Sequence, residues 1–288
     1  MTGVRDGGCS VVTGASSGIG AAIAQKLAAR KVPLFLVARS EEALARMAGE
    51  WRALHGVPVE PLALDLSEPG GAARLFEATE GAGRRVDLLV NSAGFGWVGP
   101  QAEFDTTRFL ELLRLNVVAT AELTHLFLKA MRRRGHGAIL NVASTSAFFP
   151  QPYFAAYGAS KAFLLAFTHA LHEEAKADGV TLTALCPGFT RTNFQAVAGM
   201  RGAEGTPFPE MTAEAVAEIA LAALEKGKAV AVTHRLDKVW IGTLRALPRS
   251  LPPRLAARFF RSMRLRKGDP GAPPGRPGVG GGAAGGEP

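Results

Sequence analysis

Tyr157 and Lys161 are the pair of residues best suited to carry chemistry in this sequence. They lie four positions apart in a stretch with a helical pattern, so both side chains would project from one face of that helix. A tyrosine hydroxyl titrates at about pH 10, and a neighbouring ammonium group brings its pKa towards working pH. Such a tyrosine can give a proton to a developing alkoxide or take one from an alcohol. The same spacing also occurs in helices as a stacked surface pair.

A serine that lies thirteen residues before the tyrosine could act on the same group. Ser144 follows a short apolar run and is placed to hold a carbonyl oxygen by a hydrogen bond. It belongs to the cluster Ser144, Thr145 and Ser146, in which Ser146 is a competitor for this role. The cluster could instead only cap a loop.

A glycine-rich turn, TGASSGIG at residues 13–20, stands between a short apolar run and a helical pattern. Its glycines allow a tight turn and a close approach of the backbone to a pyrophosphate. The N-terminus of the following helix then offers free N–H groups and the positive end of its dipole. The spacing is G-x-x-x-G-x-G, not G-x-G-x-x-G. A plain turn is the alternative, but the position before a helix favours dinucleotide binding.

The second apolar run ends in Ala38, Arg39 and Ser40, with no carboxylate before Glu41. An acidic residue at this point accepts hydrogen bonds from the ribose 2′-hydroxyl of NAD, whereas arginine accommodates the 2′-phosphate of NADP. A guanidinium group matches a phosphate in geometry. Arg39 therefore predicts NADP(H), the alternative being an arginine at a solvated helix start.

These residues need a scaffold, and the chain alternates short apolar runs with amphipathic stretches. Continuously apolar strands between such helices are typical of a parallel sheet covered on both faces. We therefore predict an α/β fold with a doubly wound, mostly parallel sheet in one Rossmann-type domain, and ligands at the carboxyl ends of the strands. The expected strands are 9–13, 33–38, 59–64, 86–90, 138–142, 181–185 and 229–232, and the expected helices are 19–30, 41–55, 72–80, 106–134, 154–177 and 212–226.

Composition limits the class of protein. The chain has 288 residues, of which 47% are hydrophobic and 20% charged, as in ordinary soluble globular proteins. It has no run of 18 apolar residues that would predict a membrane span, and its first residues lack the apolar core of a secretory signal. Cys9 and Cys186 are too far apart in sequence for a CxxC metal site, and two cysteines make no disulfide framework. We expect a cytoplasmic protein. His169, His172 and Glu173 lack the H-E-x-x-H order of a metal site.

The formal charge of +8 is concentrated in one short segment. Residues 1–244, the expected catalytic domain, are nearly balanced, with 24 basic and 23 acidic side chains. Residues 245–267 carry eight basic residues and no acidic one, whereas the Gly/Pro-rich residues 268–288 are expected to form a disordered tail. This distribution argues against a nucleic-acid-binding protein.

The basic segment contains an amphipathic helical pattern over residues 251–266. Leu255, Ala256, Phe259, Phe260 and Met263 fall on one half of the helix, and arginines fall on the other. This pattern is typical of a helix that contacts a membrane surface or a partner. The alternative, which we favour, is a final helix that packs Phe259 and Phe260 on its own domain or on a sister subunit.

Over residues 8–235 the sequence resembles the short-chain dehydrogenases/reductases of the TGxxxGIG subgroup. Its motifs stand in the family's order, and the one shift from the commonest form is Ala38-Arg39 in place of an acid. These motifs are TGASSGIG, Asp65-Leu66, Asn91-Ser92-Ala93-Gly94, Leu115-Asn116-Val117, Ser144, Tyr157 with Lys161, Pro187-Gly188 and Thr192.

The resemblance implies roles for named residues. It makes Asn116, Ser144, Tyr157 and Lys161 catalytic, with Lys161 also binding the nicotinamide ribose and Asn116 holding a water that links Lys161 to solvent. Asn116 could equally be a packing residue that bonds a backbone carbonyl. The cofactor-binding residues would be Gly14, Ser16, Ser17, Gly18, Ile19, Gly20, Arg39, Ser40, Asp65, Leu66, Asn91, Ala93, Gly94, Tyr157, Lys161, Pro187, Gly188, Thr190 and Thr192.

At the adenine end, Asp65 would meet the adenine amino group, between Leu66 and Ala93 as apolar walls. An aspartate at this position also serves as a plain helix cap for Ser67 onwards. Both interpretations of Asp65 stay open from the sequence alone.

The expected substrate site is apolar, because aromatic residues crowd the stretches around Ser144 and Tyr157. We expect a hydrophobic ketone or aldehyde as the substrate, although these rings could only pack the loops. The substrate residues would be Phe95, Trp97, Ser144, Phe149, Phe154, Tyr157 and Phe194.

The function that these predictions favour is an NADPH-dependent oxidoreductase that reduces a carbonyl to an alcohol, with Tyr157 as the general acid/base. The resemblance also implies a homodimer or homotetramer. The alternative is an NADP-binding redox sensor or scaffold docked through its basic C-terminal helix, which would have no use for the set Ser144, Tyr157 and Lys161. An epimerase or dehydratase shares the tyrosine and lysine, but the glycine spacing and the absence of a second substrate domain argue against it.

Overall fold

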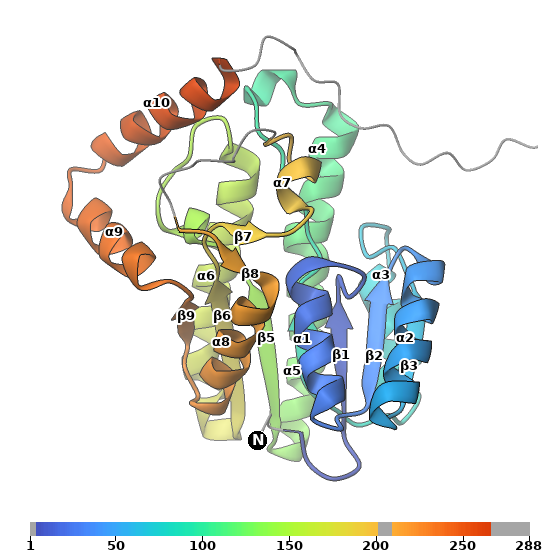
Figure 1. Ribbon diagram of the computed structural model, residues 1–288. Helices are drawn as coiled ribbons and strands as arrows, with labels where there is room; N and C mark the ends of the chain where they lie inside the picture. The colour runs from blue at the N-terminus through green and yellow to red at the C-terminus, as the bar shows by residue number, and fades with distance from the viewer. Residues whose placement is uncertain (1–3, 201–208, 266–288) are drawn as a thin grey trace, which may run out of the picture.

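Seven parallel strands form one sheet at the centre of the protein (Figure 1). The computed structural model describes residues 4–200 and 209–265, and of 261–265 only the backbone. The strand order is β3-β2-β1-β4-β5-β6-β9, and every neighbouring pair is parallel. The strands are β1 (Cys9–Thr13), β2 (Leu34–Ala38), β3 (Val59–Ala63), β4 (Val86–Asn91), β5 (Gly137–Val142), β6 (Val180–Cys186) and β9 (Val230–Val232).

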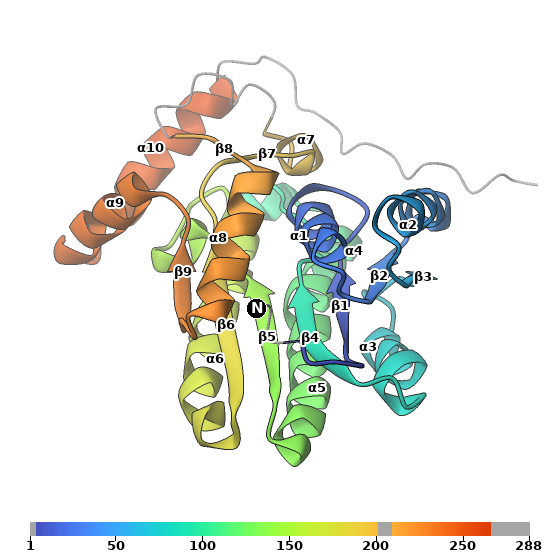
Figure 2. The same ribbon diagram turned by 60° about the horizontal axis from the view of Figure 1, so that its bottom comes forward.

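Helices cover both faces of this sheet (Figure 2). One face packs Ile23, Leu27 and Leu221 against the strands in a buried core, and the other packs Leu75, Leu123 and Phe127. The first layer consists of α1 (Gly18–Ala29), α2 (Glu41–His55) and α8 (Ala213–Glu225), and the second of α3 (Gly71–Phe76), α5 (Thr120–Arg134) and α6 (Ala155–Ala175).

The predicted doubly wound α/β fold is confirmed, and each predicted strand agrees with an observed strand to within one residue at either end. The reason is that the central strands are buried on both faces, so their sequences are continuously apolar. The carboxyl ends of the strands point to the top of Figure 1, and this edge is where the fold binds ligands.

The single helix predicted for residues 106–134 is wrong in one respect. The chain forms α4 (Thr106–Leu113), then a wider π-helical turn η3 (Arg114–Ala119), and then α5. A second π turn, η1 (Glu77–Gly81), follows α3 where an α-helix was predicted to run to residue 80. Such turns insert a residue into the helical repeat and occur often at functional sites. The sequence pattern does not distinguish them from α-helix.

The C-terminal part of the chain adds two helices beyond the β9 edge. Helix α10 (Leu251–Leu265) agrees with the predicted helix over 251–266, but α9 (Arg235–Ala246) was not predicted. Helix α9 crosses the expected domain boundary between residues 244 and 245. Helix α10 and the short α7 (Phe194–Val197) lie beyond the carboxyl ends of the strands (Figure 1). The predicted tail, residues 268–288, lies outside the described residues.

A short irregular segment links these additions to the sheet. Strand β7 (Thr190–Arg191) pairs in parallel with β8 (Met211–Thr212), and the Thr212 hydroxyl caps α8. Three 3-10 turns complete the described elements: η2 (Gln101–Glu103), η4 (Thr145–Phe148) and η5 (Lys176–Asp178).

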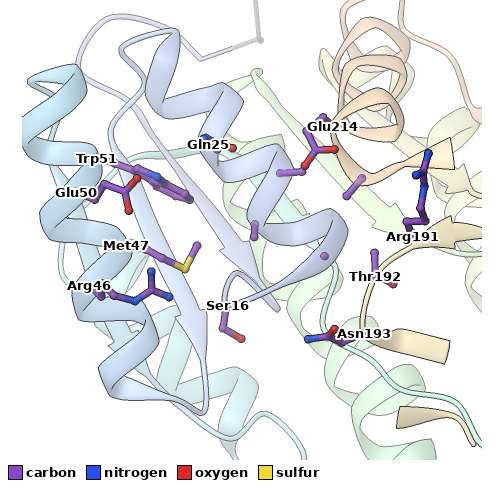
Figure 3. A pocket seen from close by; sticks show the side chains of 14 residues that line it. Ser16, Gln25, Arg46, Met47, Glu50, Trp51, Arg191, Thr192, Asn193 and Glu214 are labelled. Carbon is purple, nitrogen blue, oxygen red and sulfur yellow. The ribbon is translucent and has the colours of Figure 1, made fainter. Parts of the chain in front are cut away.

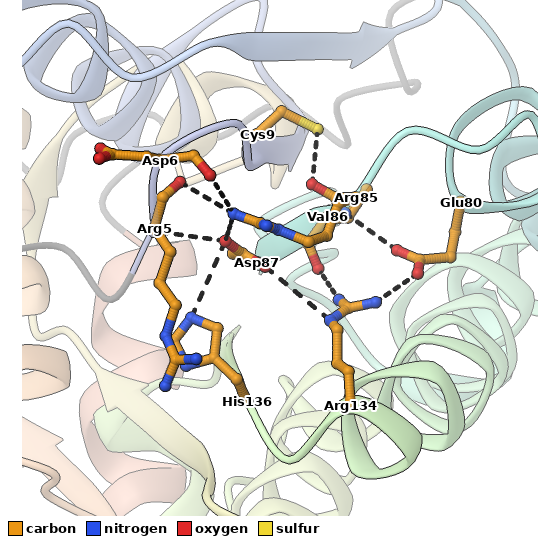
Figure 4. Close-up of polar contacts among 9 residues, drawn as sticks. All are labelled: Arg5, Asp6, Cys9, Glu80, Arg85, Val86, Asp87, Arg134 and His136. Carbon is orange, nitrogen blue, oxygen red and sulfur yellow. Dashed lines mark hydrogen bonds and ion pairs between the residues drawn. The ribbon is translucent and has the colours of Figure 1, made fainter.

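A buried carboxylate stabilises the opposite end of the sheet, where the strands begin (Figure 4). Asp87 is fully buried in β4, and its side chain accepts a hydrogen bond from the Arg5 backbone N–H at 3.0 Å. It pairs with Arg85 at 3.2 Å and lies 3.8 Å from both Arg134 and His136. Arg134 also binds Glu80 and the Val86 carbonyl. This cluster ties the N-terminal segment and α5 to β4, far from the ligand edge.

Three further observations on the described residues concern membrane-spanning helices, metal sites and cysteines. None of their helices is long and apolar enough to cross a membrane. Nowhere in residues 4–200 and 209–265 do three or more His, Cys, Asp or Glu side chains gather as a metal site would require. Cys9 and Cys186 are both buried free thiols.

Candidate active site

Tyr157, Lys161 and Ser144 lie together at the carboxyl end of β5. Tyr157 and Lys161 come from the first turns of α6 and are 7% and 5% exposed. The Ser144 and Tyr157 side chains form a hydrogen bond. The Lys161 Nζ atom donates to the Val142 carbonyl at 2.7 Å and lies 5.6 Å from the centre of the Tyr157 ring. The structure therefore brings together the three residues that the sequence predicted to act on a carbonyl.

Burial controls the protonation of both titratable groups. It raises the pKa of Tyr157 well above its ordinary value, and the Ser144 hydrogen bond opposes this only in part. Burial also lowers the pKa of Lys161 to about 8. The expected lowering of the tyrosine pKa is thus not seen in this state, because loss of solvent is the largest effect on the phenol. At neutral pH Tyr157 is a protonated phenol, which is the form that donates a proton.

Ser144 rather than Ser146 is the serine that contacts the tyrosine. Ser144 ends the β5 segment, is 7% exposed, and its Oγ accepts the Ser146 backbone N–H at 3.1 Å. It therefore caps the 3-10 turn η4 and bonds Tyr157 at the same time. The capping interpretation of the serine cluster is therefore confirmed for Ser144, and its hold on a substrate oxygen stays a prediction.

Asn116 lies within the π turn η3 and is fully buried. Its Nδ2 donates to the Phe95 carbonyl at 2.9 Å and to the Ser160 hydroxyl at 3.2 Å, while its Oδ1 accepts the Phe95 N–H at 3.1 Å. A Cβ on Gly94 would lie 2.9 Å from Asn116 Oδ1 and 3.6 Å from Lys161 Nζ. Asn116 thus packs against backbone groups and lies near Lys161, while its role in holding a water stays a prediction.

The glycine-rich turn is held tightly against the loop after β4. Gly14 has φ +66°, and a Cβ there would lie 2.8 Å from the Ala93 backbone nitrogen. A Cβ on Gly20 would lie 2.4 Å from the Gly14 carbonyl. The Thr13 hydroxyl accepts the backbone N–H groups of Ser92 and Ala93 at 3.1 and 3.2 Å. The turn therefore requires glycine for its shape, whereas a plain flexible turn would accept other residues at these positions.

The N-terminus of α1 opens towards the ligand edge. Its N-cap residue, Ser17, makes no side-chain capping bond and is exposed. Ser16, Gly18 and Ile19 are half-buried beside it. A Cβ on Gly18 would lie 3.2 Å from the Thr192 methyl group, so the segment after β6 passes over this helix end. These N–H groups have the position and the dipole that suit a phosphate group.

Arg39 lies at the same edge, as predicted, but it has two carboxylate neighbours. Its side chain is 67% exposed, and NH1 lies 3.4 Å from Glu111 and 3.9 Å from Asp65. Glu111, which comes from α4, is also bonded to Arg108 at 2.6 Å. Ser40 caps α2 by accepting the Ala43 N–H at 3.3 Å. Sequence reasoning missed Glu111, because nothing in its local pattern indicates that α4 reaches β2.

Asp65 caps the segment that begins at Ser67, whereas its contact with an adenine amino group stays a prediction. Its Oδ1 accepts from the Ser67 N–H and hydroxyl at 2.8 and 2.6 Å, which is the capping arrangement. Its Oδ2 faces Arg39. Leu66 is buried in the core with 6% exposure and Ala93 is partly buried, and their role as apolar walls for an adenine ring stays a prediction.

Asn91 is the predicted cofactor residue whose side chain points elsewhere. It is 3% exposed, and its Nδ2 donates to Asn141 at 2.9 Å and to Thr124 at 3.2 Å. Asn141 in turn donates to Thr168 at 2.9 Å. The side chain is therefore part of a polar network inside the second helix layer. Asn91 is also the last residue of β4, at the ligand edge, and its role beside a cofactor stays a prediction.

The segment after β6 borders the site from the other side. The Pro187 carbonyl accepts the Thr145 N–H at 3.0 Å, so it lies next to the turn that follows Ser144. The Thr190 hydroxyl bonds the Gly188 carbonyl at 3.1 Å and Thr192 the Thr190 carbonyl at 3.4 Å. A Cβ on Gly188 would lie 2.2 Å from Asp237 of α9. These contacts place all four predicted residues of the segment between Ser144 and the N-terminus of α1.

Aromatic rings surround Tyr157. Phe154 stacks on it at a centroid distance of 4.4 Å, and Phe194 lies 5.1 Å away. Phe260 of α10 packs on Phe154 at 5.7 Å, and the same buried cluster contains Met200. Phe260 and Met200 were not among the predicted substrate residues. The predicted C-terminal helix that contains Phe260 was, however, expected to pack on its own domain. The contacts of Phe260 agree with that interpretation.

The remaining predicted substrate residues are less close to the tyrosine. Trp97 stacks on Phe104 at 4.2 Å, and Phe95 lies under the Arg108 guanidinium at 4.6 Å. Phe149 is half-buried after the turn η4. Trp97 and Phe95 thus have packing partners outside the cluster around Tyr157, and the substrate roles of these three residues stay predictions.

A buried thiol lies beneath the site and was also missed. The Ser144 backbone N–H bonds the Cys186 sulfur, and Cys186 is close enough to Tyr157 and Lys161 to affect both electrostatically. Burial raises the pKa of Cys186 to about 12, so the thiol stays protonated. Its position at the end of β6, next to the end of β5, follows from the parallel pairing of these strands.

A cavity of about 400 Å³ adjoins the glycine-rich turn (Figure 3). Arg46, Met47 and Trp51 of α2 form one wall of it, and Thr192 stands on the far side beside Gly18. Tyr157, Lys161 and Ser144 do not line this cavity. It therefore lies on the outer side of the turn rather than over the reacting groups.

Comparisons with known proteins agree with this geometry. A family model described as short chain dehydrogenase matches residues 9–201. The very-long-chain 3-oxoacyl-CoA reductase of Anas platyrhynchos is 32% identical over 196 residues, which are 66% of this chain and 62% of the relative. The chain thus spans less than two thirds of that relative's length.

Solved structures are similar over most of their length. A short-chain dehydrogenase from Sphingobium yanoikuyae in complex with NADPH has a TM-score of 0.74 and 30% identity, covering 84% of this chain and 97% of that chain. A 7β-hydroxysteroid dehydrogenase has a TM-score of 0.77 and 26% identity, covering 89% and 96%.

Proposed function

This chain belongs to the short-chain dehydrogenase family and is an oxidoreductase, and on that premise we propose that it reduces a hydrophobic ketone or aldehyde to an alcohol with NADPH. The observation that carries the proposal is the hydrogen bond between the buried Tyr157 phenol and Ser144, with Lys161 alongside. This arrangement is a proton donor paired with a second hydroxyl that can hold the same oxygen.

The residues present fit a dinucleotide. The close approach of Gly14 to Ala93 leaves no room for a side chain, and the uncapped N-terminus of α1 offers N–H groups to a diphosphate. Arg39 is exposed beyond it and would bind the 2′-phosphate, and Lys161 would bind the nicotinamide ribose. When bound, the reduced dinucleotide supplies the hydride that forms the new C–H bond.

The protein's own residues supply the proton. Ser144 and Tyr157 hold the substrate oxygen by hydrogen bonds, and Tyr157 transfers its phenolic proton to that oxygen as negative charge develops on it. The O–H bond of the tyrosine breaks as the O–H bond of the alcohol forms, which leaves a phenolate. The Lys161 ammonium stabilises the phenolate until solvent returns a proton. Because burial raises the pKa of Tyr157, the resting phenol carries the proton that reduction requires.

The rings of Phe154, Phe194 and Phe260 support an apolar substrate. The names of two related proteins, a very-long-chain 3-oxoacyl-CoA reductase and a 7β-hydroxysteroid dehydrogenase, both denote substrates with large apolar skeletons. Such skeletons match the lining around Tyr157 better than sugars or short acids do.

A panel of carbonyl compounds, from short hydrophilic to long hydrophobic, assayed with NADPH and NADH in parallel, tests this proposal. We expect kcat/KM to rise with apolar surface and to be higher with NADPH. Tyr157→Phe should abolish turnover while NADPH binding, followed by fluorescence, is retained. Tyr153→Phe, which alters the chain's other tyrosine, should keep turnover. Equal kcat/KM across the panel would exclude the hydrophobic substrate, and turnover by Tyr157→Phe would exclude the proton donor.

We also propose a homodimer or homotetramer that forms through α4, α5 and α6. Leu110 of α4, Val118 of η3 and Phe163 of α6 are large apolar side chains that are 41%, 56% and 40% exposed on these elements. Apolar surface of this kind supports a subunit interface. Analytical ultracentrifugation of the wild-type chain and of Val118→Glu would give the assembly state.

A further inference from the structure

The apolar residues of the two C-terminal helices divide between an inner and an outer face. On α9, Ile241 and Leu244 are buried against the protein body. On α10, Ala256 and Phe260 are buried in the cluster around Tyr157. Part of the apolar face that the sequence predicts over residues 251–266 is therefore buried inside the protein.

The outer faces of α9 and α10 also carry large apolar side chains. Leu236, Val239 and Trp240 of α9 are 60%, 67% and 44% exposed, and they share one face because they stand three and four residues apart. Leu251 and Leu255 of α10 are 37% and 38% exposed. Five of the ten large apolar side chains that are exposed in the described part of the chain thus lie on α9 and α10. Single exposed apolar residues are ordinary, but a cluster indicates an interaction site.

Basic residues accompany this apolar surface, and acidic residues do not. Asp237 is the one acidic residue between 226 and 265, and its side chain is buried with 8% exposure. The net charge of the exposed outer faces is therefore strongly positive. The exposed basic residues on and between the helices are Arg235, Lys238, Arg245, Arg249, Arg254 and Arg258.

The turn between the helices, residues 247–250, brings these residues to one projecting end of the molecule. In both ribbon views this turn lies at the outer edge, away from the sheet (Figures 1 and 2). A helix rises about 1.5 Å per residue, so Val239 and Leu255 each lie within roughly 10 Å of the turn along their helices. We call the outer faces of α9 and α10, with this turn, the α9–α10 tip.

We propose that the α9–α10 tip docks on an anionic lipid surface. Apolar side chains of this kind insert at the boundary of headgroups and acyl chains, and arginine and lysine beside them pair with lipid phosphates. A second copy of this chain fits the tip poorly, because a twofold interface would bring the same positive residues together. The tip therefore adds peripheral membrane attachment to the enzyme, without a membrane-spanning helix among the described residues.

The test is vesicle sedimentation of the full chain. We expect tight binding to phosphatidylcholine vesicles that contain phosphatidylglycerol and little binding to phosphatidylcholine alone, with weaker binding as salt is raised. The double variant Arg245→Gln/Arg249→Gln should bind on the order of 30-fold more weakly, at about 1 kcal/mol per cation. The matched control Arg46→Gln/Arg133→Gln removes two exposed cations elsewhere and should bind as the wild type does.

A second pair of variants tests the apolar contribution at unchanged charge. Leu236→Ser/Val239→Ser should weaken vesicle binding about tenfold, and Leu54→Ser, which alters a residue that is 67% exposed on α2, should not. Melting temperatures should be the same for all of these surface variants, so that weaker binding is not caused by unfolding.

Five outcomes would overturn the proposal. These are the absence of binding to anionic vesicles, equal binding to both kinds of vesicle, and full binding by the arginine variant. The fourth is full binding by the serine variant together with competition by polyglutamate, which would instead indicate an acidic protein partner. A lower sedimentation mass of the serine variant without vesicles would assign the tip to a subunit interface and would also overturn it.

Discussion

The ring of Phe260 packs on the ring of Phe154 at a centroid distance of 5.7 Å, so the C-terminal helix touches the residue that stacks on Tyr157. Phe154 is 4% exposed and Phe260 is 6% exposed. One ring therefore separates α10 from the proton donor. A substrate that reaches Tyr157 must share this space with the C-terminal helix.

Replacing Phe260 should change which carbonyl compounds react. In Phe260→Ala the space beside Phe154 widens, so we expect the ratio of kcat/KM for bulky over small ketones to rise about tenfold. Phe260→Leu should shift the ratio in the same direction by less. Leu54→Ala, which shortens a side chain that is 67% exposed on α2, is the control and should leave the ratio unchanged. An unchanged ratio in folded Phe260→Ala would show that α10 does not border the substrate.

The two serines of the loop after β5 should behave differently. Ser144→Ala removes the hydroxyl that bonds Tyr157, and we expect kcat to fall by about 100-fold. Ser146→Ala leaves that hydroxyl in place, because Ser146 contributes only its backbone N–H to Ser144, and kcat should stay within about twofold. Steady-state kinetics of both variants checks this. Equal losses would mean that the loop's shape, and not the Ser144 hydroxyl, matters.

Arg39 and its neighbour Glu111 should have opposite effects on cofactor choice. Arg39→Ala removes the exposed cation at the end of β2, so kcat/KM with NADPH should fall about 30-fold while that with NADH stays near its original value. Glu111→Gln removes a carboxylate 3.4 Å from the guanidinium, and we expect a lower KM for NADPH because the competing charge is gone. Arg46→Ala, which removes an arginine of α2, is the control and should leave kcat/KM unchanged with both cofactors. Equal losses with both cofactors in Arg39→Ala would place the 2′-phosphate elsewhere.

The rate of reduction should decrease above about pH 8, where Lys161 loses its proton. Below this pH the ammonium stabilises the phenolate that proton transfer leaves, and above it kcat should fall by up to about tenfold per pH unit. Unfolding does not explain such a fall. The pKa of Lys161 is lower in the folded chain than its ordinary 10.5, so between these values the unfolded chain binds more protons and the contribution of Lys161 to stability rises with pH.

A pH profile of kcat, with thermal melting at each pH, measures both effects. Lys161→Met should be slow throughout and lack the decrease near pH 8. A profile that stays flat to pH 10 would contradict the assignment of this ionisation to Lys161.

Asp87 should matter for stability and not for catalysis. Asp87→Asn removes the charge that Arg85 and Arg134 neutralise inside β4, so we expect the free energy of unfolding to fall by about 1–3 kcal/mol. The melting temperature should drop by about 2–4 °C per kcal/mol. Asp6→Asn, an exposed neighbour, should have little effect. Because the cluster lies at the amino ends of the strands, kcat at low temperature should be unchanged, and a large loss would link this cluster to the site.

The sequence was sufficient to predict those parts of the site whose relative positions follow from local spacing along the chain. Tyr157 and Lys161 share a face because they stand one helical turn apart, and Ser144 reaches them because strand ends meet at one edge of a parallel sheet. The strands were recognisable because burial on both faces requires an unbroken apolar run.

Features that depend on packing density or on distant segments were not predictable. The Glu111 to Arg39 contact joins residues 72 positions apart, and no local pattern indicates it. The direction of the Tyr157 pKa shift depends on how completely other segments exclude water from the phenol. Helix α9 was missed although its sequence is amphipathic, with Ile241 and Leu244 buried and Lys238 and Arg245 exposed.

The family match ends at residue 201, whereas α10, whose Phe260 packs on Phe154, lies entirely after it. On the prediction made for Phe260, genetic change in the last part of the gene would alter which molecules are admitted without touching the codons of Ser144, Tyr157 and Lys161. Selection can act on substrate range and on reaction chemistry through separate stretches of one chain. Exchange of C-terminal segments between paralogues would then be a short evolutionary route to a new substrate.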